Sequence, residues 1–114
     1  MTKLIENKEE INRIINERIK NRKLIFTDKY KIGIMRRNIL HEKVLEIFPQ
    51  FEKVFAIEED ILKFGDVGYE LYYRLSNNIE FSIATCPLNK ELLIIHAIEH
   101  KKSLEKRFSN LRLK

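Results

Sequence analysis

The sequence predicts an α+β protein: an antiparallel sheet of three to five strands, with an N-terminal helix and an αα-hairpin packed on it and a short C-terminal helix. Apolar residues recur at helical spacing near the start of the chain and again from residue 38. After residue 68 they occupy alternate positions, as in half-buried strands. The length of 114 residues fits a single domain, 1–114, with one core.

A helix is expected over about residues 7–22. Asn7 followed by Glu10 has the spacing of a capping box. Four isoleucines then recur on one helical face: Ile11, Ile14, Ile15 and Ile19. This stripe must be buried, either within the chain or against a second copy, so we expect a monomer or a homodimer. The short connection to the next apolar segment favours packing within the chain.

Residues 23–36 contain two short apolar runs, which predict a β-hairpin or a single strand with Gly33 at a bulge. Helical spacing returns over 38–64, where Pro49 separates two predicted helices. Proline ends one helix and can occupy the first turn of the next. The outward faces of these helices hold the acidic residues of the middle of the chain.

A strand meander is expected over 69–98. The segments "YELYYRL" and "IEFSIA" alternate apolar and polar residues, and "LLII" supplies a third strand. A short helix over about 103–111 follows. The alternative for residues 92–108 is one long helix, because apolar residues there also form a helical stripe.

His96 and His100 enclose the pattern H-x-x-E-H, which on a helix is a zinc-protease motif. On a strand their Cα atoms lie about 13 Å apart, too far for both side chains to ligate one Zn²⁺ in the helical manner. The predicted strand therefore argues against a metal site.

Charge is distributed unevenly along the chain. Residues 1–37 carry 11 Lys and Arg against 5 Asp and Glu, residues 38–68 carry 3 against 7, and residues 69–114 carry 8 against 5. Basic ends of this kind suit a polyanionic partner. With no apolar run of membrane-spanning length and a single cysteine, Cys86, the chain is expected to be cytoplasmic and not associated with a membrane.

Two stretches resemble the RelE/HigB-type ribonuclease toxins of the barnase-like and colicin-like group. "GYELYYRL" (68–75) is similar to their central strand, and "KELLIIHAIEHKKSLEKRF" (90–108) is similar to their last strand and its basic exit. Such toxins usually carry an arginine where this chain has Glu70. Here Arg74 lies four residues further along the strand, on the same face. The resemblance implies a small endoribonuclease that needs neither metal nor cofactor, acts on RNA or the ribosome, and is paired with an antitoxin protein.

Cleaving RNA without a metal requires a base, an acid and cations near the phosphate. Glu70, like Glu99, can act as a base or orient a histidine. The alternative is a non-catalytic module, of viral, plasmid or mobile-element origin, that binds nucleic acid or inhibits a protein. The candidate catalytic residues are Arg74, His96, His100, Lys101, Glu99 and Tyr72, and the candidate nucleic-acid-binding residues are Lys20, Arg22, Lys23, Arg36, Arg37, Lys102, Lys106 and Arg107.

Overall fold

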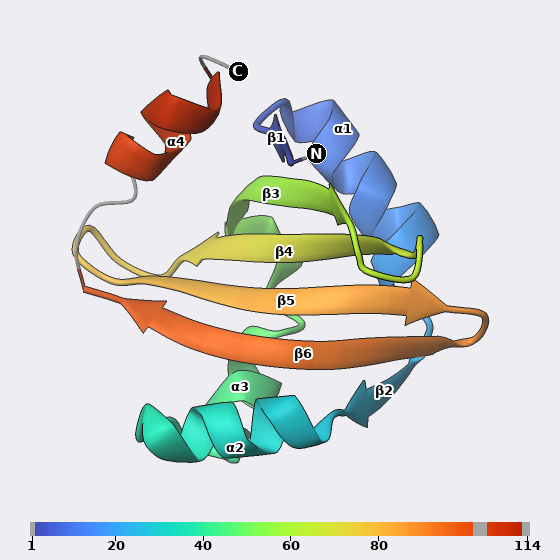
Figure 1. The fold of residues 1–114 in the computed structure, drawn as a ribbon. Helices are drawn as coiled ribbons and strands as arrows, with labels where there is room; N and C mark the ends of the chain where they lie inside the picture. Colours follow the sequence, from blue (N-terminus) through green and yellow to red (C-terminus); the bar gives the residue numbers. More distant parts are fainter. Residues whose placement is uncertain (1, 102–104, 113–114) are drawn as a thin grey trace.

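The computed structural model describes residues 2–101 and 105–112 of the chain. Strands and helices alternate in the first half, and four long strands form most of the second (Figure 1). The elements are β1 (Lys3–Ile5), α1 (Lys8–Ile14), the π-helical turn η1 (Ile15–Ile19), β2 (Lys23–Phe26), α2 (Asp28–Arg36), α3 (His41–Ile47), the 3₁₀ turn η2 (Phe51–Lys53), β3 (Val54–Ile61), β4 (Val67–Arg74), β5 (Glu80–Leu88), β6 (Glu91–His100) and α4 (Glu105–Arg112).

In the described part of the chain the strands form one six-stranded sheet in the order β1-β3-β4-β5-β6-β2. Neighbouring strands are antiparallel except β2, which pairs with β6 in parallel from Lys23 opposite Glu91 to Phe26 opposite Ile94. The prediction of an antiparallel sheet of three to five strands is therefore wrong. The sheet is mixed because β2 pairs in parallel, and it has six strands because β1, β2 and β3 all join the meander.

The helix predicted after Pro49 is the second error, because residues Val54–Ile61 form β3. Both faces of this strand are covered, with Ile57 fully buried in the main core and Glu58 6% exposed on the other face. Burial on both sides removes the alternation that marks a strand in sequence. The hairpin predicted over 23–36 is also replaced, by β2 followed by α2. Gly33 thus lies within a helix and not at a strand bulge.

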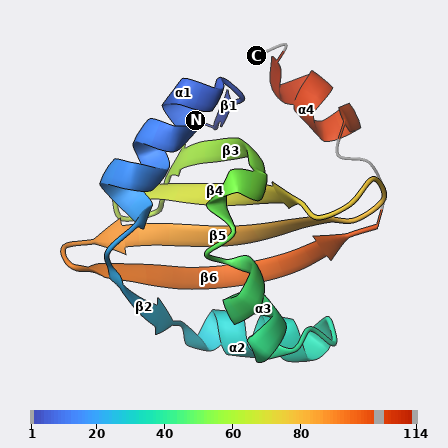
Figure 2. The ribbon, with the colours of Figure 1, turned by 180° about the vertical axis from the view of Figure 1, so that it is seen from behind.

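The N-terminal helix forms as its sequence predicts. The Asn7 side chain accepts a hydrogen bond from the Glu10 backbone N–H at 3.0 Å, and α1 continues into η1. The four isoleucines of the stripe are each at most 3% exposed and pack against the sheet within the chain. Helix α1 and α3 lie on the same face of the sheet, as seen from behind (Figure 2).

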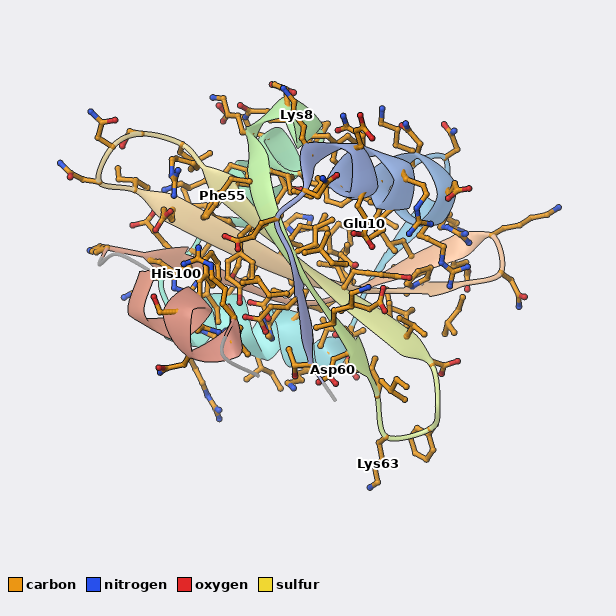
Figure 3. The ribbon with its side chains drawn as sticks, turned by 90° about the horizontal axis from the view of Figure 1, so that it is seen from above. Lys8, Glu10, Phe55, Asp60, Lys63 and His100 are labelled. Atoms are coloured by element: carbon orange, nitrogen blue, oxygen red, sulfur yellow. The ribbon has the colours of Figure 1, made fainter. Side chains whose placement is uncertain are left out.

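The two faces of the sheet differ in character. Leu71, Phe81 and Ile83 are fully buried in the main core beneath α1 and α3. The opposite face carries polar side chains and is partly covered by α4, which lies on the other side of the sheet from α1 (Figure 3). Residues 92–108 accordingly contain the predicted strand and not one long helix.

Candidate functional site

A β-bulge in β6 decides which way His96 points. Ile94 pairs with Thr85 and His96 pairs with Ala84, so β6 has one more residue than β5 at this point, Ile95. Ile94 is buried in the main core, whereas Ala84 and His96 belong to the opposite face. Without the bulge, residues 94 and 96 would share a face, as the sequence pattern predicts. Bulges commonly redirect a side chain next to a functional site.

Helix α2 runs along the edge of β6, where β2 ends (Figure 1). Thr27 sets this position with three hydrogen bonds. Its backbone N–H and its Oγ1 donate to the Ile94 carbonyl at 3.2 and 3.1 Å, and its Oγ1 accepts from the Tyr30 N–H at 3.1 Å. Tyr30 and Ile34 of α2 enter the main core. The helix is therefore fixed to the strand that carries His96.

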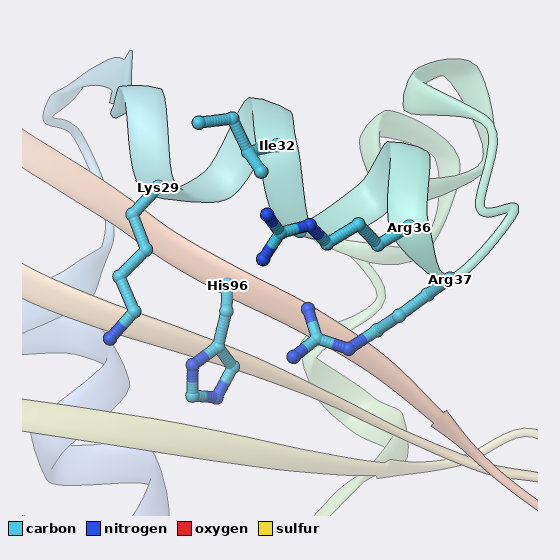
Figure 4. Close-up of a pocket in the computed structure, with 6 residues that line it drawn as sticks. Lys29, Ile32, Arg36, Arg37 and His96 are labelled. Atoms are coloured by element: carbon cyan, nitrogen blue, oxygen red, sulfur yellow. The ribbon is translucent and has the colours of Figure 1, made fainter.

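A pocket of about 430 Å³ lies between α2 and β6. The side chains of Lys29, Arg36 and Arg37 extend toward His96 (Figure 4). The remaining lining residues are Ile32, which is 50% exposed, and Gly33. These residues converge because positions 29, 32, 33 and 36 lie on one face of a helix.

Gly33 makes room for one of the three cations. A Cβ atom at position 33 would lie 2.6 Å from an Arg37 guanidinium nitrogen. The Arg37 side chain therefore occupies the space beside the helix that any larger residue would enter. Among the described residues, no carboxylate lies within ion-pair distance of Lys29, Arg36 or Arg37. The pocket thus holds three positive charges, none of which forms an ion pair with a described residue.

His96 contacts a carboxylate on its other side. Its Nε2 atom is buried and lies 3.4 Å from Glu70 Oε2, without the geometry of a hydrogen bond. Burial raises the pKa of Glu70, but His96, Ser82 and Arg107 together outweigh burial, so the pKa lies below its usual value. An ionised Glu70 beside Nε2 favours the His96 tautomer that carries its proton on Nε2, in which Nδ1 is the acceptor.

A second group of polar residues lies on the same sheet face, beneath α4. Tyr72 donates a hydrogen bond from its hydroxyl to Glu58 Oε1 at 2.7 Å. Arg107 of α4 donates from its Nε to the same oxygen at 2.7 Å and from its Nη2 to Glu58 Oε2 at 2.8 Å. Burial raises the pKa of Tyr72, and the carboxylates of Glu70 and Glu58 raise it further. Tyr72 therefore remains protonated at neutral pH.

His100 is held at the far end of this face. Its Nε2 lies 2.9 Å from Ser82 Oγ, and its ring centroid is 6.1 Å from that of Tyr72. Burial lowers the pKa of His100, and although the nearby Glu70 and Glu80 raise it, the net pKa lies below its usual value. The surroundings of His100 thus favour its neutral form.

The candidate catalytic residues are only partly brought together. Tyr72, Arg74, His96 and His100 share the polar face, but His96 and His100 lie four positions apart on an extended strand, about 13 Å between Cα atoms. Arg74 donates two hydrogen bonds to Glu80 and lies 4.0 Å above the Phe55 ring.

Two of the candidates lie away from that face. Glu99 accepts from Lys43 of α3 at 2.6 Å, on the side of the main core, and the pairing with Lys43 lowers its pKa. Lys101 is exposed beyond the end of β6. The six candidate catalytic residues are therefore too dispersed to contact a single phosphate together.

Of the candidate nucleic-acid-binding residues, Arg36 and Arg37 line the basic pocket. The others are dispersed. Lys20 lies 5.5 Å above the Phe51 ring, Arg22 donates to the carbonyls of Asn89 and Glu17, and Lys23 begins β2. Arg107 is paired with Glu58, Lys106 belongs to α4, and Lys102 lies outside the described residues.

Lys29 lines the pocket although it is not among the nucleic-acid-binding residues that the sequence predicts. The threonine cap at Thr27 was its available signal, because a helix beginning at Asp28 places Lys29 and Arg36 two turns apart on one face. Glu70 was considered as a residue that orients a histidine, and it is the glutamate that lies beside His96.

Comparison of the chain with family models, curated proteins and solved structures found no match in any of the three. In the part of the chain that the structure describes, no group of three or more His, Cys, Asp and Glu residues could hold a metal ion. The helices of the same part are too short and too polar to cross a membrane.

Proposed function

We propose that the protein binds single-stranded RNA in the cytoplasm, with a backbone phosphate in the pocket between α2 and β6. The convergence on His96 of Lys29, Arg36 and Arg37, which make no ion pair with the described residues, is the observation that carries this proposal. Such side chains are the usual donors to phosphate oxygens, and arginine donates in pairs. Three cations that lie together without an ion-pair partner repel one another, and a bound anion lowers this repulsion.

The shape of the pocket favours a single strand over a duplex. It holds about 430 Å³ and lies between a helix and a strand, which suits one phosphate and its neighbouring ribose. The exposed apolar side chain of Ile32 in its lining, with Met35 76% exposed on the same helix, offers contact to an unstacked base. RNA recognition commonly uses single-stranded segments for this reason.

Fluorescence anisotropy with a labelled RNA octamer tests the proposal, using the full chain at several salt concentrations. In the variant Lys29→Gln/Arg36→Gln/Arg37→Gln, we expect the slope of log K against log salt to fall by about 0.7, the value for the one phosphate contact that the pocket makes with a single strand. The matched control, Lys8→Gln/Lys63→Gln/Lys90→Gln, removes three exposed lysines and should leave the slope almost unchanged. Equal slopes in the two variants contradict the proposal. Binding of a DNA octamer of the same sequence shows whether the protein prefers ribose to deoxyribose.

A second candidate function is cleavage of the bound RNA without a metal, as the resemblance to ribonuclease toxins implies. The His96–Glu70 contact favours it, because the carboxylate favours a proton on Nε2 and leaves Nδ1 as an acceptor on a residue that lines the basic pocket. In this mechanism Nδ1 accepts the 2′-hydroxyl proton, the 2′-oxygen attacks phosphorus, and the 5′-oxygen leaves with a proton from water or Lys29. The products are a 2′,3′-cyclic phosphate and a 5′-hydroxyl, while Arg36 and Arg37 stabilise the phosphate charge.

Incubation with RNA in EDTA, followed by analysis of the product ends, tests this second candidate. His96→Asn should abolish cleavage while RNA binding persists, and His100→Asn should retain cleavage because His100 lies at the other end of the sheet face. Cleavage by His96→Asn at the native rate contradicts the mechanism. If the native chain binds RNA without cutting it, the binding function remains and the catalytic one is withdrawn.

A further inference from the structure

A second cavity, of about 260 Å³, adjoins the basic pocket on the polar face of the sheet. Lys29 and His96 line both cavities, so the two are neighbours on either side of these side chains. The second cavity is lined by the small residues Gly68 and Ala84 and by the apolar side chains of Leu62 and Ile95. A Cβ atom at position 68 would lie 3.1 Å from the Leu62 side chain, so Gly68 permits this packing.

The polar groups of this cavity are different from those of the basic pocket. The carboxylates of Glu58, Asp60 and Glu70 line it, together with Arg107. Glu58 already accepts from Arg107 and Tyr72, whereas Glu70 faces His96 across 3.4 Å. An ionised carboxylate offers about four acceptor positions, so Glu70 retains the capacity to accept from a ligand. Small apolar walls with a few convergent polar groups are typical of a small-molecule site.

We propose that this second cavity is a nucleobase subsite, which takes a base with an exocyclic amine, guanine above the others. The inference rests on the proposed RNA binding, since the base belongs to the nucleotide whose phosphate lies in the basic pocket. Two neighbouring cavities, one lined by cations and the other with three carboxylates in its lining, fit a ligand that is anionic at one end and rich in donors at the other. A nucleotide of an amine-bearing base has this arrangement.

The chemistry of the bases sets the expected order of preference. Guanine presents its ring N1–H and its amine side by side, so both donate to one carboxylate. Cytosine donates from its N4 amine, for which Glu and Asp are the usual acceptors. Uracil presents one N–H between two carbonyl oxygens, which a carboxylate repels. The order is therefore guanine first and uracil last.

Direct titration of the full chain with GMP and with IMP tests the subsite, because the two nucleotides differ only in the 2-amino group. By calorimetry we expect GMP to bind about tenfold more tightly than IMP, as for one hydrogen bond to a charged acceptor. Amide NMR shifts should include Gly68 and Ala84. Equal affinities, or no binding of either nucleotide, overturn the subsite. The salt-slope experiment with RNA is scored separately, so failure of the phosphate site is distinguished from failure of the base site.

Two variants test whether the preference for GMP over IMP arises in the second cavity. Glu70→Gln should reduce the GMP-to-IMP affinity ratio to about one, because a neutral amide is a weaker acceptor than a carboxylate. Ala84→Val, at a strand position that tolerates a β-branched residue, narrows the cavity and should weaken GMP at least fivefold, while titration with inorganic phosphate stays unchanged. GMP binding to Ala84→Val at the native affinity overturns the proposal, even if Glu70→Gln fails to fold.

Discussion

Arg107 on α4 donates two hydrogen bonds to Glu58 on β3, from Nε to Oε1 at 2.7 Å and from Nη2 to Oε2 at 2.8 Å. Glu58 is 6% exposed, whereas more than half of the Arg107 side chain is exposed. The carboxylate is thus kept away from water by a helix whose apolar contacts are few, chiefly Phe108 with partly buried Leu111. The geometry is the bidentate one that arginine forms with carboxylates.

Arg107→Ala should lower the free energy of unfolding by about 2 kcal/mol, because it leaves a buried carboxylate with one fewer partner. The exposed arginine end keeps this cost below that of a fully buried pair. Urea denaturation measures the change. The matched control is Arg112→Ala, whose partner Glu6 is exposed; this substitution should cost at most about 1 kcal/mol.

Adding Glu58→Gln to Arg107→Ala should recover part of the lost stability, because the neutral amide is less costly to bury than an unpaired carboxylate. A double variant less stable than Arg107→Ala contradicts the assignment of the cost to the buried charge.

The protein should lose stability as the pH falls from 7.5 to 5.5, in part because of His100. Its pKa is lowered in the folded state from the ordinary 6.5, so between the folded pKa and 6.5 the unfolded chain binds more protons. The stabilisation is complete above 6.5 and decreases as the pH falls toward the folded pKa. Urea denaturation of His100→Asn should show a smaller decrease over this range than the native chain. A decrease of the same size in both chains contradicts the assignment.

Glu70 acts in a different pH range. Its pKa is lowered from 4.5, so its contribution is complete above 4.5 and is lost as the pH falls through the folded pKa. The difference in stability between the native chain and Glu70→Gln should therefore narrow at pH values below 4.5. A difference that stays constant from pH 7 to pH 3 contradicts the lowered pKa.

Substitution of Ile14 tests the buried isoleucine stripe. Ile14 is 1% exposed and its side chain packs in the main core, so Ile14→Ala should cost about 2–5 kcal/mol of unfolding free energy. Asn16→Ala, at an exposed position of the same segment, should change stability by less than about 0.5 kcal/mol. A chain that begins at Lys23 should not fold, since it lacks β1 as well as the stripe. A folded monomer or dimer of that truncated chain would contradict this packing.

The elements that the sequence predicts well are those whose residue types keep a clear period. The isoleucine stripe of α1 repeats at helical spacing, and β4 and β5 alternate in sequence although residues on both of their faces are buried. Strand β3 has no such alternation, because residues 54–57 are all apolar, and the burial of Glu58 depends on Arg107, which lies 49 residues away. A contact of that range leaves no local pattern.

The candidate site could be predicted only in part for the same reason. Its position depends on the bulge at Ile95, which turns His96 away from the face that holds Ile94, and no residue type in "LLIIHAIEH" marks the extra residue. The parallel pairing of β2 with β6 is also long-range, and it places α2 beside His96. Arg36 and Arg37 were named from charge alone, whereas their convergence with Lys29 follows from the tertiary fold.

Thr27 connects the fold to the proposed site, since it caps α2 and binds the Ile94 carbonyl next to the bulge. Thr27→Ala removes both side-chain hydrogen bonds and should cost about 1–2 kcal/mol of stability. Loosening α2 from β6 should also weaken RNA binding at least threefold, because the three cations then hold their positions less firmly. The matched control is Asn7→Ala, which removes the cap of α1 on the far side of the sheet at a cost of about 1 kcal/mol. If the two variants lose similar stability and RNA affinity falls equally in both, α2 does not position the phosphate site.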